Sequence, residues 1–226
     1  MINYSSYQQF NHQFLKVSDI YVVSQFPKCG CSTVTLQSLV YNLKGEITLE
    51  QFSEAENKHL LFIRDKEPFI EKGLFQVSNE FHINESNVKH YPGQKVVVIF
   101  RDPIKRFLSA YNTSVIPDNE KKPEEILNRI KTQLERGELI NLHYNPQCIY
   151  YDFNDVDIFV NLENYPDFCK ENNIPWIMAN KNISEKYLKY IPSQELIENI
   201  KKLYEEDCEL IKRIQNSDKL YKPSNL

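Results

Sequence analysis

A short stretch near the start of the chain combines a lysine, a glycine and two hydroxyl side chains. Residues 27–33 read P-K-C-G-C-S-T and directly follow the apolar segment D-I-Y-V-V-S-Q-F at 19–26. Backbone N–H groups at a helix N-terminus carry partial positive charge and bind phosphate. Gly30 would let the backbone approach such a ligand closely, and Lys28 would add a point charge. The stretch predicts an anion-binding loop, and the alternative is a tight strand-to-helix turn with a solvated lysine.

A second set of candidate anion ligands follows another apolar run. Residues 95–100 read K-V-V-V-I-F, Arg101 comes next, and Ser109 lies eight residues further on, about two helical turns away. An arginine fork and a hydroxyl on one face can hold a second phosphate. The alternative is that Arg101 and Asp102 only cap the next helix. Arg106 is expected to be an ordinary surface or salt-bridge residue.

Two common nucleotide motifs and a metal site are not encoded. A Walker A loop needs a Gly-Lys-Ser/Thr end, but here the lysine precedes its glycine and the next glycine is Gly45. A Gly-x-Gly-x-x-Gly fingerprint does not occur in the chain. Cys29 and Cys31 alone do not make a zinc site, which needs two more ligands at suitable spacing. We therefore expect no metal.

Apolar patterning places both stretches at the ends of buried strands. Short apolar runs predict strands, three- and four-residue steps predict helices, and Pro103 and Ser193 are placed to begin two of these helices. The order of strands and helices predicts an α/β fold with three layers, α/β/α, around a central parallel sheet. Ligands in such folds bind beyond the carboxyl ends of the strands, where Lys28 and Arg101 both fall. The predicted strands are 19–26, 95–100 and 156–160, and the predicted helices are 32–43, 103–111, 123–136 and a single helix from 193 to 214.

Composition narrows the class of protein. A net charge of −4 and a pI near 5.8 argue against a general nucleic-acid binder. No window approaches the roughly 18 apolar residues of a membrane span, and the first residues lack the pattern of a signal peptide. We expect a cytoplasmic protein, although the possibility that a membrane anchor was removed from the chain stays open. An odd, scattered set of cysteines fits reduced thiols, namely Cys29, Cys31, Cys148, Cys169 and Cys208.

Together the two stretches resemble the sulfotransferases that use 3′-phosphoadenosine 5′-phosphosulfate (PAPS). P-K-C-G-C-S-T resembles the family's 5′-phosphosulfate loop, and R-D-P-I-K-R-F-L-S-A-Y at 101–111 resembles its 3′-phosphate element. The resemblance is closer to the carbohydrate branch, which sulfates glycan hydroxyls. It implies a P-loop NTPase-like sulfotransferase fold, with residues 1–226 forming one domain. Three more stretches resemble segments of that branch: H-Y-N-P-Q-C at 143–148, V-D-I-F-V-N-L-E-N-Y-P-D-F at 156–168, and L-Y-E-E-D-C-E-L-I at 203–211.

The resemblance implies roles for individual residues. Lys28 matches the lysine that contacts the bridging oxygen of the leaving group, and Arg101 with Ser109 matches the pair that binds the 3′-phosphate. Thr33 and Val34 stand where many members carry an aromatic residue, so adenine stacking must come from elsewhere. A cysteine also replaces a more usual hydroxyl or small residue at position 31, which weakens one side-chain contact. The loop that would wrap the 5′-phosphate consists of Cys29, Gly30, Cys31, Ser32 and Thr33.

The implied reaction is in-line transfer of a sulfuryl group from PAPS to an acceptor hydroxyl, which releases 3′,5′-adenosine bisphosphate (PAP). It requires no metal, but the hydroxyl proton must pass to a base whose pKa is near neutral. Histidine suits that task. The resemblance favours His82 as the base, with His143 in the His-x-x-Pro-Gln segment as the second candidate. The chain has five histidines, His12, His59, His82, His90 and His143.

The acceptor is not specified by these motifs. A carbohydrate hydroxyl is the first expectation, and a tyrosine or a small-molecule hydroxyl stays open. The segments that should shape the acceptor pocket, 46–95 and 112–150, are the least recognisable. A binding module that holds the 3′-phosphorylated nucleotide without turnover is a second hypothesis. A nucleotide kinase is a third, and the missing Gly-Lys-Ser/Thr counts against it. Oligomeric state is not readable from the sequence.

Overall fold

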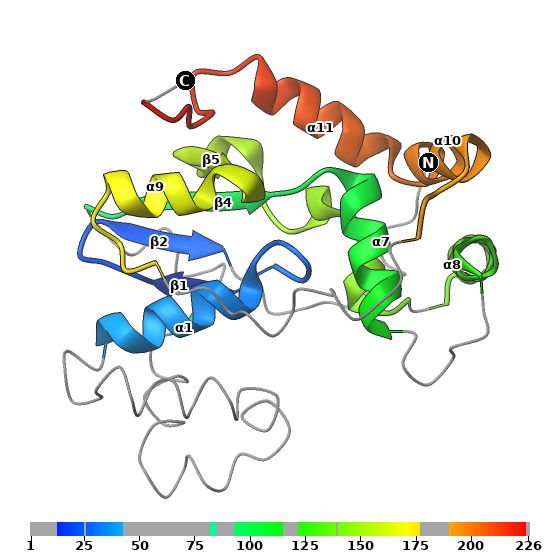
Figure 1. The fold of residues 1–226 in the computed structure, drawn as a ribbon, viewed down its shortest axis with the longest axis horizontal. Coiled ribbons are helices and arrows are strands. Elements are labelled where there is room, and N and C mark those ends of the chain that lie inside the picture. The colour runs from blue at the N-terminus through cyan, green and yellow to red at the C-terminus, as the bar shows by residue number, and fades with distance from the viewer. Residues whose placement is uncertain are drawn as a thin grey trace, which may run out of the picture.

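A computed structural model describes residues 13–24, 26–42, 82–84, 93–114, 122–138, 140–176 and 190–224. These residues form a five-stranded sheet in the order β3-β1-β2-β4-β5, with helices around it (Figure 1). The α/β fold predicted from the sequence is therefore confirmed. The strands are β1 (Gln13–Lys16), β2 (Tyr21–Ser24), β3 (His82–Asn84), β4 (Lys95–Phe100) and β5 (Ile158–Asn161).

The sheet is mixed, which corrects the prediction of a wholly parallel sheet. Strands β2, β4 and β5 are parallel, as predicted, but β1 runs antiparallel to β2, and β3 antiparallel to β1. The sequence analysis did not predict β1. Only residues 17–20 connect β1 to β2, which is too short for the crossover that a parallel pair needs. Ser18 Oγ holds this turn by accepting the N–H groups of Ile20 (3.2 Å) and Tyr21 (3.0 Å).

Most of the predicted helices are present with nearly the predicted limits, but the last one is broken. Pro103 begins its helix as predicted, and Ser193 Oγ caps the next-to-last helix by accepting the N–H of Leu196 at 3.1 Å. The continuous helix predicted from 193 to 214 is wrong, because Tyr204 leaves helical geometry (φ −109°, ψ 37°). The helices are α1 (Cys31–Asn42), α7 (Pro103–Ser114), α8 (Pro123–Glu135), α9 (Tyr165–Glu171), α10 (Gln194–Leu203) and α11 (Glu205–Gln215).

Four short 3₁₀ helices complete the described structure, and none of them was predicted. They are η2 (Leu142–Tyr144), η3 (Gln147–Ile149), η4 (Phe153–Asp155) and η5 (Leu162–Asn164). The first three follow one another between α8 and β5, so this part of the chain folds into tight turns without a long helix. That segment contains the His-x-x-Pro-Gln residues and contacts α7 and α11.

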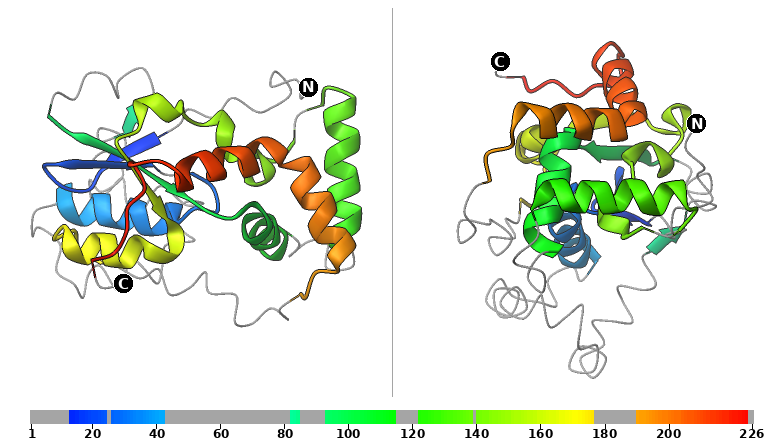
Figure 2. Two further views of the ribbon diagram at one scale, coloured as in Figure 1. Left: turned by 90° about the horizontal axis from the view of Figure 1, so that it is seen from above. Right: turned by 90° about the vertical axis from the view of Figure 1, so that its right-hand side faces the viewer.

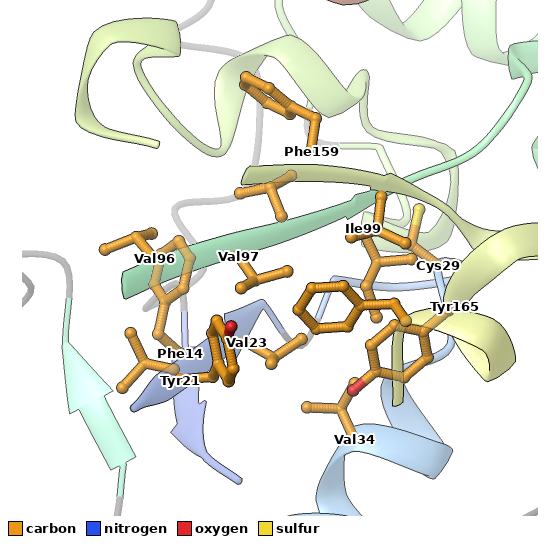
Figure 3. Packing of buried hydrophobic residues seen from close by; sticks show 14 of the residues in the cluster. Phe14, Tyr21, Val23, Cys29, Val34, Val96, Val97, Ile99, Phe159 and Tyr165 are labelled. Carbon is orange, nitrogen blue, oxygen red and sulfur yellow. The ribbon is translucent and has the colours of Figure 1, made fainter. Parts of the chain in front are cut away.

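Helices α1 and α9 lie together on one face of the sheet (Figure 2). Gln37 of α1 joins them, because its Oε1 accepts the Tyr165 hydroxyl at 2.6 Å. On the other side of β4 and β5, Phe159 points away from Tyr165 and Val34 (Figure 3). There the rings of Phe159 and Phe153 stack at 5.2 Å. Apolar burial on both faces explains why the central strands read as continuous runs of Val, Ile and Phe.

A second apolar cluster packs α7, α8 and α10 against one another beside the sheet. Ile149 packs against both this cluster and the core around the sheet. The two clusters thus share a contact, in keeping with the single domain expected over 1–226, which stays a prediction. The buried members of the second cluster are Phe107, Ala110, Ile126, Leu127, Ile130, Ile140, Tyr144, Leu196, Ile200, Leu203 and Tyr204.

Several predictions fall on residues that the structure does not describe. They include residue 43, the predicted end of the first helix, and most of 46–95, the first of the two segments expected to shape the acceptor pocket. Of the second segment, 115–121 is likewise outside the described residues. Among the helices that are described, none has the length and apolar character needed to cross a bilayer. All five cysteines lie in described segments and are free thiols.

Candidate functional site

The two predicted anion-binding stretches begin at one edge of the sheet. Strands β2 and β4 are parallel neighbours, with Val23 opposite Val97, so their carboxyl ends lie side by side. Beyond this pair, Ser24 Oγ accepts the N–H of Ile99 at 3.0 Å, within the buried core. The loop after β2 and the start of α7 therefore leave the sheet next to each other (Figure 1). The expected juxtaposition of Lys28 and Arg101 is present.

The loop after β2 has an unusual backbone. Lys28 has φ 64° and Gly30 has φ 82°, both in the left-handed region. That region costs a residue with a Cβ about 1–2 kcal/mol, and glycine escapes this cost. A Cβ at Gly30 would also lie 2.9 Å from Leu162 Cδ1. Glycine at position 30 thus allows both the turn and its close packing against η5, and the strain at Lys28 is of the kind that clusters at functional sites.

Helix α1 follows directly from this loop, so the N-terminus of the helix lies at the end of the loop. The helix begins at Cys31, and the N–H of Val34 makes the first bond of its ladder by donating to Gly30 O at 3.1 Å. The N–H groups of residues 31–33 precede that bond, so they have no acceptor within the helix. Such groups form an anion site. Thr33 is half-buried there, and the side chain of Ser32 lies outside the described part.

Cys29 holds the loop from inside. Its side chain is fully buried, and its Sγ donates to Gln147 Oε1 at 3.2 Å. Its N–H donates to Phe26 O at 3.2 Å and so closes the turn. Burial raises the pKa of the Cys29 thiol to about 11, so the thiol keeps its proton as a donor at neutral pH. Cys29 therefore anchors the loop through contacts made within the protein.

Arg101 connects the two stretches directly. Its guanidinium Nη1 donates to the carbonyl oxygen of Lys28 at 3.3 Å. The neighbouring Asp102 is the helix cap that the alternative interpretation required, because its Oδ1 accepts the N–H of Lys105 at 2.9 Å. Arg101 itself turns to the loop and does not cap α7. Ser109 is half-buried two turns further along α7.

The site concentrates positive charge in a chain whose net charge is negative. Burial lowers the pKa of Lys28 below its usual value, and Arg101 and Arg106 lower it further, while Cys31 opposes them. Burial also lowers the pKa of Arg101. Cations that are desolvated and repel one another gain most from an anion bound between them. This part of the surface is therefore suited to a multiply charged anion despite the overall charge of −4.

Arg106 corrects the expectation of an ordinary surface residue. It is only 2% exposed, its Nε donates to Pro27 O at 3.1 Å, and its Nη1 donates to Asn145 O. Arg106 thus ties the loop after β2 to the segment that follows α8. Helical spacing carried a signal of this burial, because Arg106 shares a face of α7 with the buried Pro103 and Ala110.

Replacing Arg106 by methionine is expected to lower the free energy of unfolding by about 2 to 6 kcal/mol. Methionine fills similar space but leaves two buried carbonyl oxygens without their donors, at about 1–3 kcal/mol each. Urea unfolding followed by circular dichroism would measure the change. The matched control is Arg136→Met, because the Arg136 side chain is 68% exposed and should cost under about 0.5 kcal/mol. Equal losses in the two variants would contradict the anchoring role of Arg106.

Gln147 and Asp207 are two further buried polar residues at the site that the sequence analysis did not select. Gln147 is 2% exposed, and its side-chain amide pairs with the backbone of Arg101. Asp207 of α11 is fully buried, and its carboxylate accepts the N–H groups of Gln147 (2.9 Å) and Cys148 (2.8 Å). A signal for Asp207 was available, because it lies one helical turn before Leu210 and Ile211 on the apolar face of α11.

Of the two histidine candidates, His143 lies at the site. It is half-buried in η2, and its Nδ1 is 2.9 Å from Asn141 Oδ1. Burial, together with the positive charges of Lys28 and Arg106, lowers the pKa of His143 to about 4. His82 begins β3, with its backbone opposite Leu15, and its side chain lies outside the described residues. The prediction for His82 therefore stays a prediction.

Comparison with known proteins agrees with this geometry. Residues 20–176 match the model of the sulfotransferase family. This span covers β2, the loop with Lys28, β4, Arg101 and β5. The chain therefore belongs to the sulfotransferase family, a class of enzymes that move a sulfuryl group to an acceptor. No curated protein and no solved structure matches the chain.

Proposed function

We propose that this protein transfers the sulfuryl group of PAPS to a hydroxyl, most simply on a carbohydrate. The observation that carries the proposal is the 3.3 Å contact between Arg101 Nη1 and Lys28 O. It brings the candidate ligands for the 5′-phosphosulfate and for the 3′-phosphate to one edge of the sheet. A nucleotide with phosphates at both positions would engage both, whereas one without a 3′-phosphate would engage only the loop.

The residues present suit such a donor. The N–H groups at the start of α1 would bind its 5′-phosphate, and the left-handed Gly30 keeps side-chain atoms out of the turn. Arg101 and Ser109 would bind the 3′-phosphate. PAPS would supply an activated sulfuryl group on a phosphate leaving group. Lys28 would stabilise the charge that grows on that phosphate, and its lowered pKa makes it a better hydrogen-bond and proton donor there.

We assign the role of base to His143. The contact with Asn141 Oδ1 requires a proton on Nδ1, which leaves the lone pair of Nε2 to accept the acceptor's proton. With a pKa of about 4, the imidazole is neutral at pH 7 but only weakly basic. An anion bound beside Lys28 would cancel part of the positive charge that lowers this pKa. Donor binding would thus raise the basicity of His143 toward the value that a general base needs.

A carbohydrate acceptor is supported by the likeness of residues 143–148, 156–168 and 203–211 to the glycan branch of the family. Contacts of all three segments support the proposal, because Asp207 bonds to Gln147, Gln147 bonds to Arg101, and Leu162 lies against Gly30. A tyrosine or small-molecule hydroxyl would be recognised in an acceptor screen with labelled PAPS. We also propose a reducing compartment such as the cytoplasm, because all five cysteines are free thiols.

Calorimetric titration with PAP and with 5′-AMP tests the donor site. We expect wild-type protein to bind PAP at least tenfold more tightly than 5′-AMP. Arg101→Ala should weaken the binding of PAP by about 10- to 50-fold, which is the value of a lost charge-assisted hydrogen-bond pair. The same substitution should change the binding of 5′-AMP little. Arg136→Ala, at an exposed position just after α8, is the control and should bind like wild type. Equal or absent binding of both nucleotides by wild type would refute the proposal. Tight PAP binding without sulfuryl transfer to any acceptor would indicate a binding module.

A further inference from the structure

The side chain of Gln147 bonds to both halves of the proposed donor site. Its Oε1 accepts the N–H of Arg101 at 2.9 Å and the thiol of Cys29 at 3.2 Å. Its Nε2 donates to Arg101 O at 2.7 Å. One buried amide is therefore bonded to the residue that would bind the 3′-phosphate and to the loop that would bind the 5′-phosphate. Strand β4 ends at Phe100, so the amide also satisfies backbone groups of Arg101 just beyond the strand.

Gln147 is itself held by a residue of α11. The carboxylate of Asp207 accepts the N–H groups of Gln147 and Cys148, the first two residues of η3. The carboxylate thus provides the acceptor for both N–H groups at the start of η3. Asp207 can reach η3 because α10 ends at Leu203 and α11 begins at Glu205, and the Tyr204 hydroxyl between them donates to Tyr144 O at 2.7 Å. The break at Tyr204 thereby places Asp207 where its carboxylate can bond to the backbone of Gln147.

We propose that Gln147 is a positioning residue that sets the spacing between the two phosphate-binding elements, with Asp207 as its anchor. The inference rests on the proposed function, since it concerns the same donor site. Gln147 contacts no reacting atom in this assignment. Its effect is to hold Arg101 and Cys29 at a fixed separation, so that a donor with both phosphates meets both elements without moving either of them.

The amide group suits this role because it accepts and donates at once. Glutamate in its place would lose the donor to Arg101 O, and methionine would lose all three bonds while filling similar space. In such a variant the separation between the two phosphate-binding elements would no longer be fixed. A ligand that contacts only one element would bind as before. A ligand that spans both would have to restore the spacing at the expense of its own affinity. Loss of the Gln147 contacts should therefore weaken the binding of PAP, which has both phosphates, more than the binding of a monophosphate.

The test is titration of Gln147→Met with three ligands, PAP, 5′-AMP and 3′-AMP. We expect PAP to bind at least tenfold more weakly than to wild type, and each monophosphate to stay within about threefold. Cys29→Ala removes only the bond on the loop side and should weaken PAP by about 3- to 10-fold with the same selectivity. Gln215→Met is the matched control, because Gln215 is exposed at the end of α11 and should leave all three affinities unchanged.

The outcomes separate this inference from the proposed function. If wild type shows no preference for PAP over 5′-AMP, the donor site itself is wrong, and the positioning role is overturned with it. If wild type shows the preference but Gln147→Met leaves the affinity for PAP unchanged, or lowers the affinity for all three ligands equally, only the positioning role is overturned. Thermal unfolding identifies a Gln147→Met protein that does not fold, and Cys29→Ala then decides, because unchanged PAP binding in that variant overturns the inference.

Discussion

Lys28→Gly is expected to lower the rate of sulfuryl transfer by about 10²–10³-fold and to leave the protein as stable as before. In the role proposed for Lys28, the substitution removes a donor that faces charge developing on the leaving group, which lowers the rate. Stability should persist because Lys28 has φ 64°, a backbone conformation that glycine adopts without strain. The relief of about 1 kcal/mol offsets the extra freedom that glycine gives the unfolded chain. Most substitutions at catalytic residues cannot separate the two effects so cleanly.

The matched control for this variant is Asn173→Gly. Asn173 is the other non-glycine residue with positive φ in the described part of the chain, at φ 53° just after α9. It is exposed, and the neighbouring Asn172 bonds to Tyr21 at the start of β2, whereas the site follows the end of that strand. The same backbone change should therefore leave both activity and stability near wild type. Release of labelled sulfate from PAPS to water, and transfer to a panel of glycans, would give the rates. A Lys28→Gly enzyme with wild-type turnover would show that Lys28 has no role in the chemical step.

His143→Gln is expected to reduce kcat by about 10²–10⁴-fold, the usual contribution of a general base. Glutamine keeps a polar side chain in the same half-buried position but cannot take up the proton. His82→Gln should have a much smaller effect if His143 is the base. The opposite ranking of the two variants would show that the base is His82, which is the assignment favoured by the sequence resemblance. Binding of PAP to each variant checks that the donor site is intact.

The pH dependence of the wild-type enzyme offers a second readout on His143. A base must be neutral to act, so activity falls as the pH drops through its pKa. In the free enzyme that pKa is about 4, which places the acid limb of kcat/KM for the donor near pH 4. A bound anion beside Lys28 raises the pKa, so the acid limb of kcat should lie at higher pH than that of kcat/KM. Acid limbs at the same pH would contradict the coupling between donor and base.

The elements that position the site follow from local patterns. Strands β2, β4 and β5 and helices α1, α7 and α8 lie close to the predicted ranges, because apolar periodicity, Pro103 and the Pro-Glu-Glu start of α8 act within one element. The carboxyl ends of parallel neighbours meet at one edge of a sheet, so the order of these elements was enough to place Lys28 beside Arg101. The pairing of a loop lysine with a strand-end arginine was predictable for that reason.

The polar contacts that hold these elements at a fixed separation were not predictable in the same way. Arg106 bonds to a carbonyl 79 residues earlier in the chain, and Asp207 bonds to a backbone N–H 60 residues earlier. Whether such a charged residue is buried depends on a distant partner that satisfies it, and local composition does not carry that information. The same holds for the pairing of β1 with the distant β3, and for the break at Tyr204, whose hydroxyl bonds to Tyr144 O.

The sequence by itself therefore determined most of the strands and helices, where the candidate anion-binding groups stand on them, and the family to which the chain belongs. The tertiary structure alone decided that His143 lies beside the site's positive charge, and that Arg106, Gln147 and Asp207 are buried and bond to distant parts of the chain. The physical reason is that strand and helix patterns are set by neighbours a few residues apart, whereas buried hydrogen bonds require donors and acceptors that only the folded chain brings into contact.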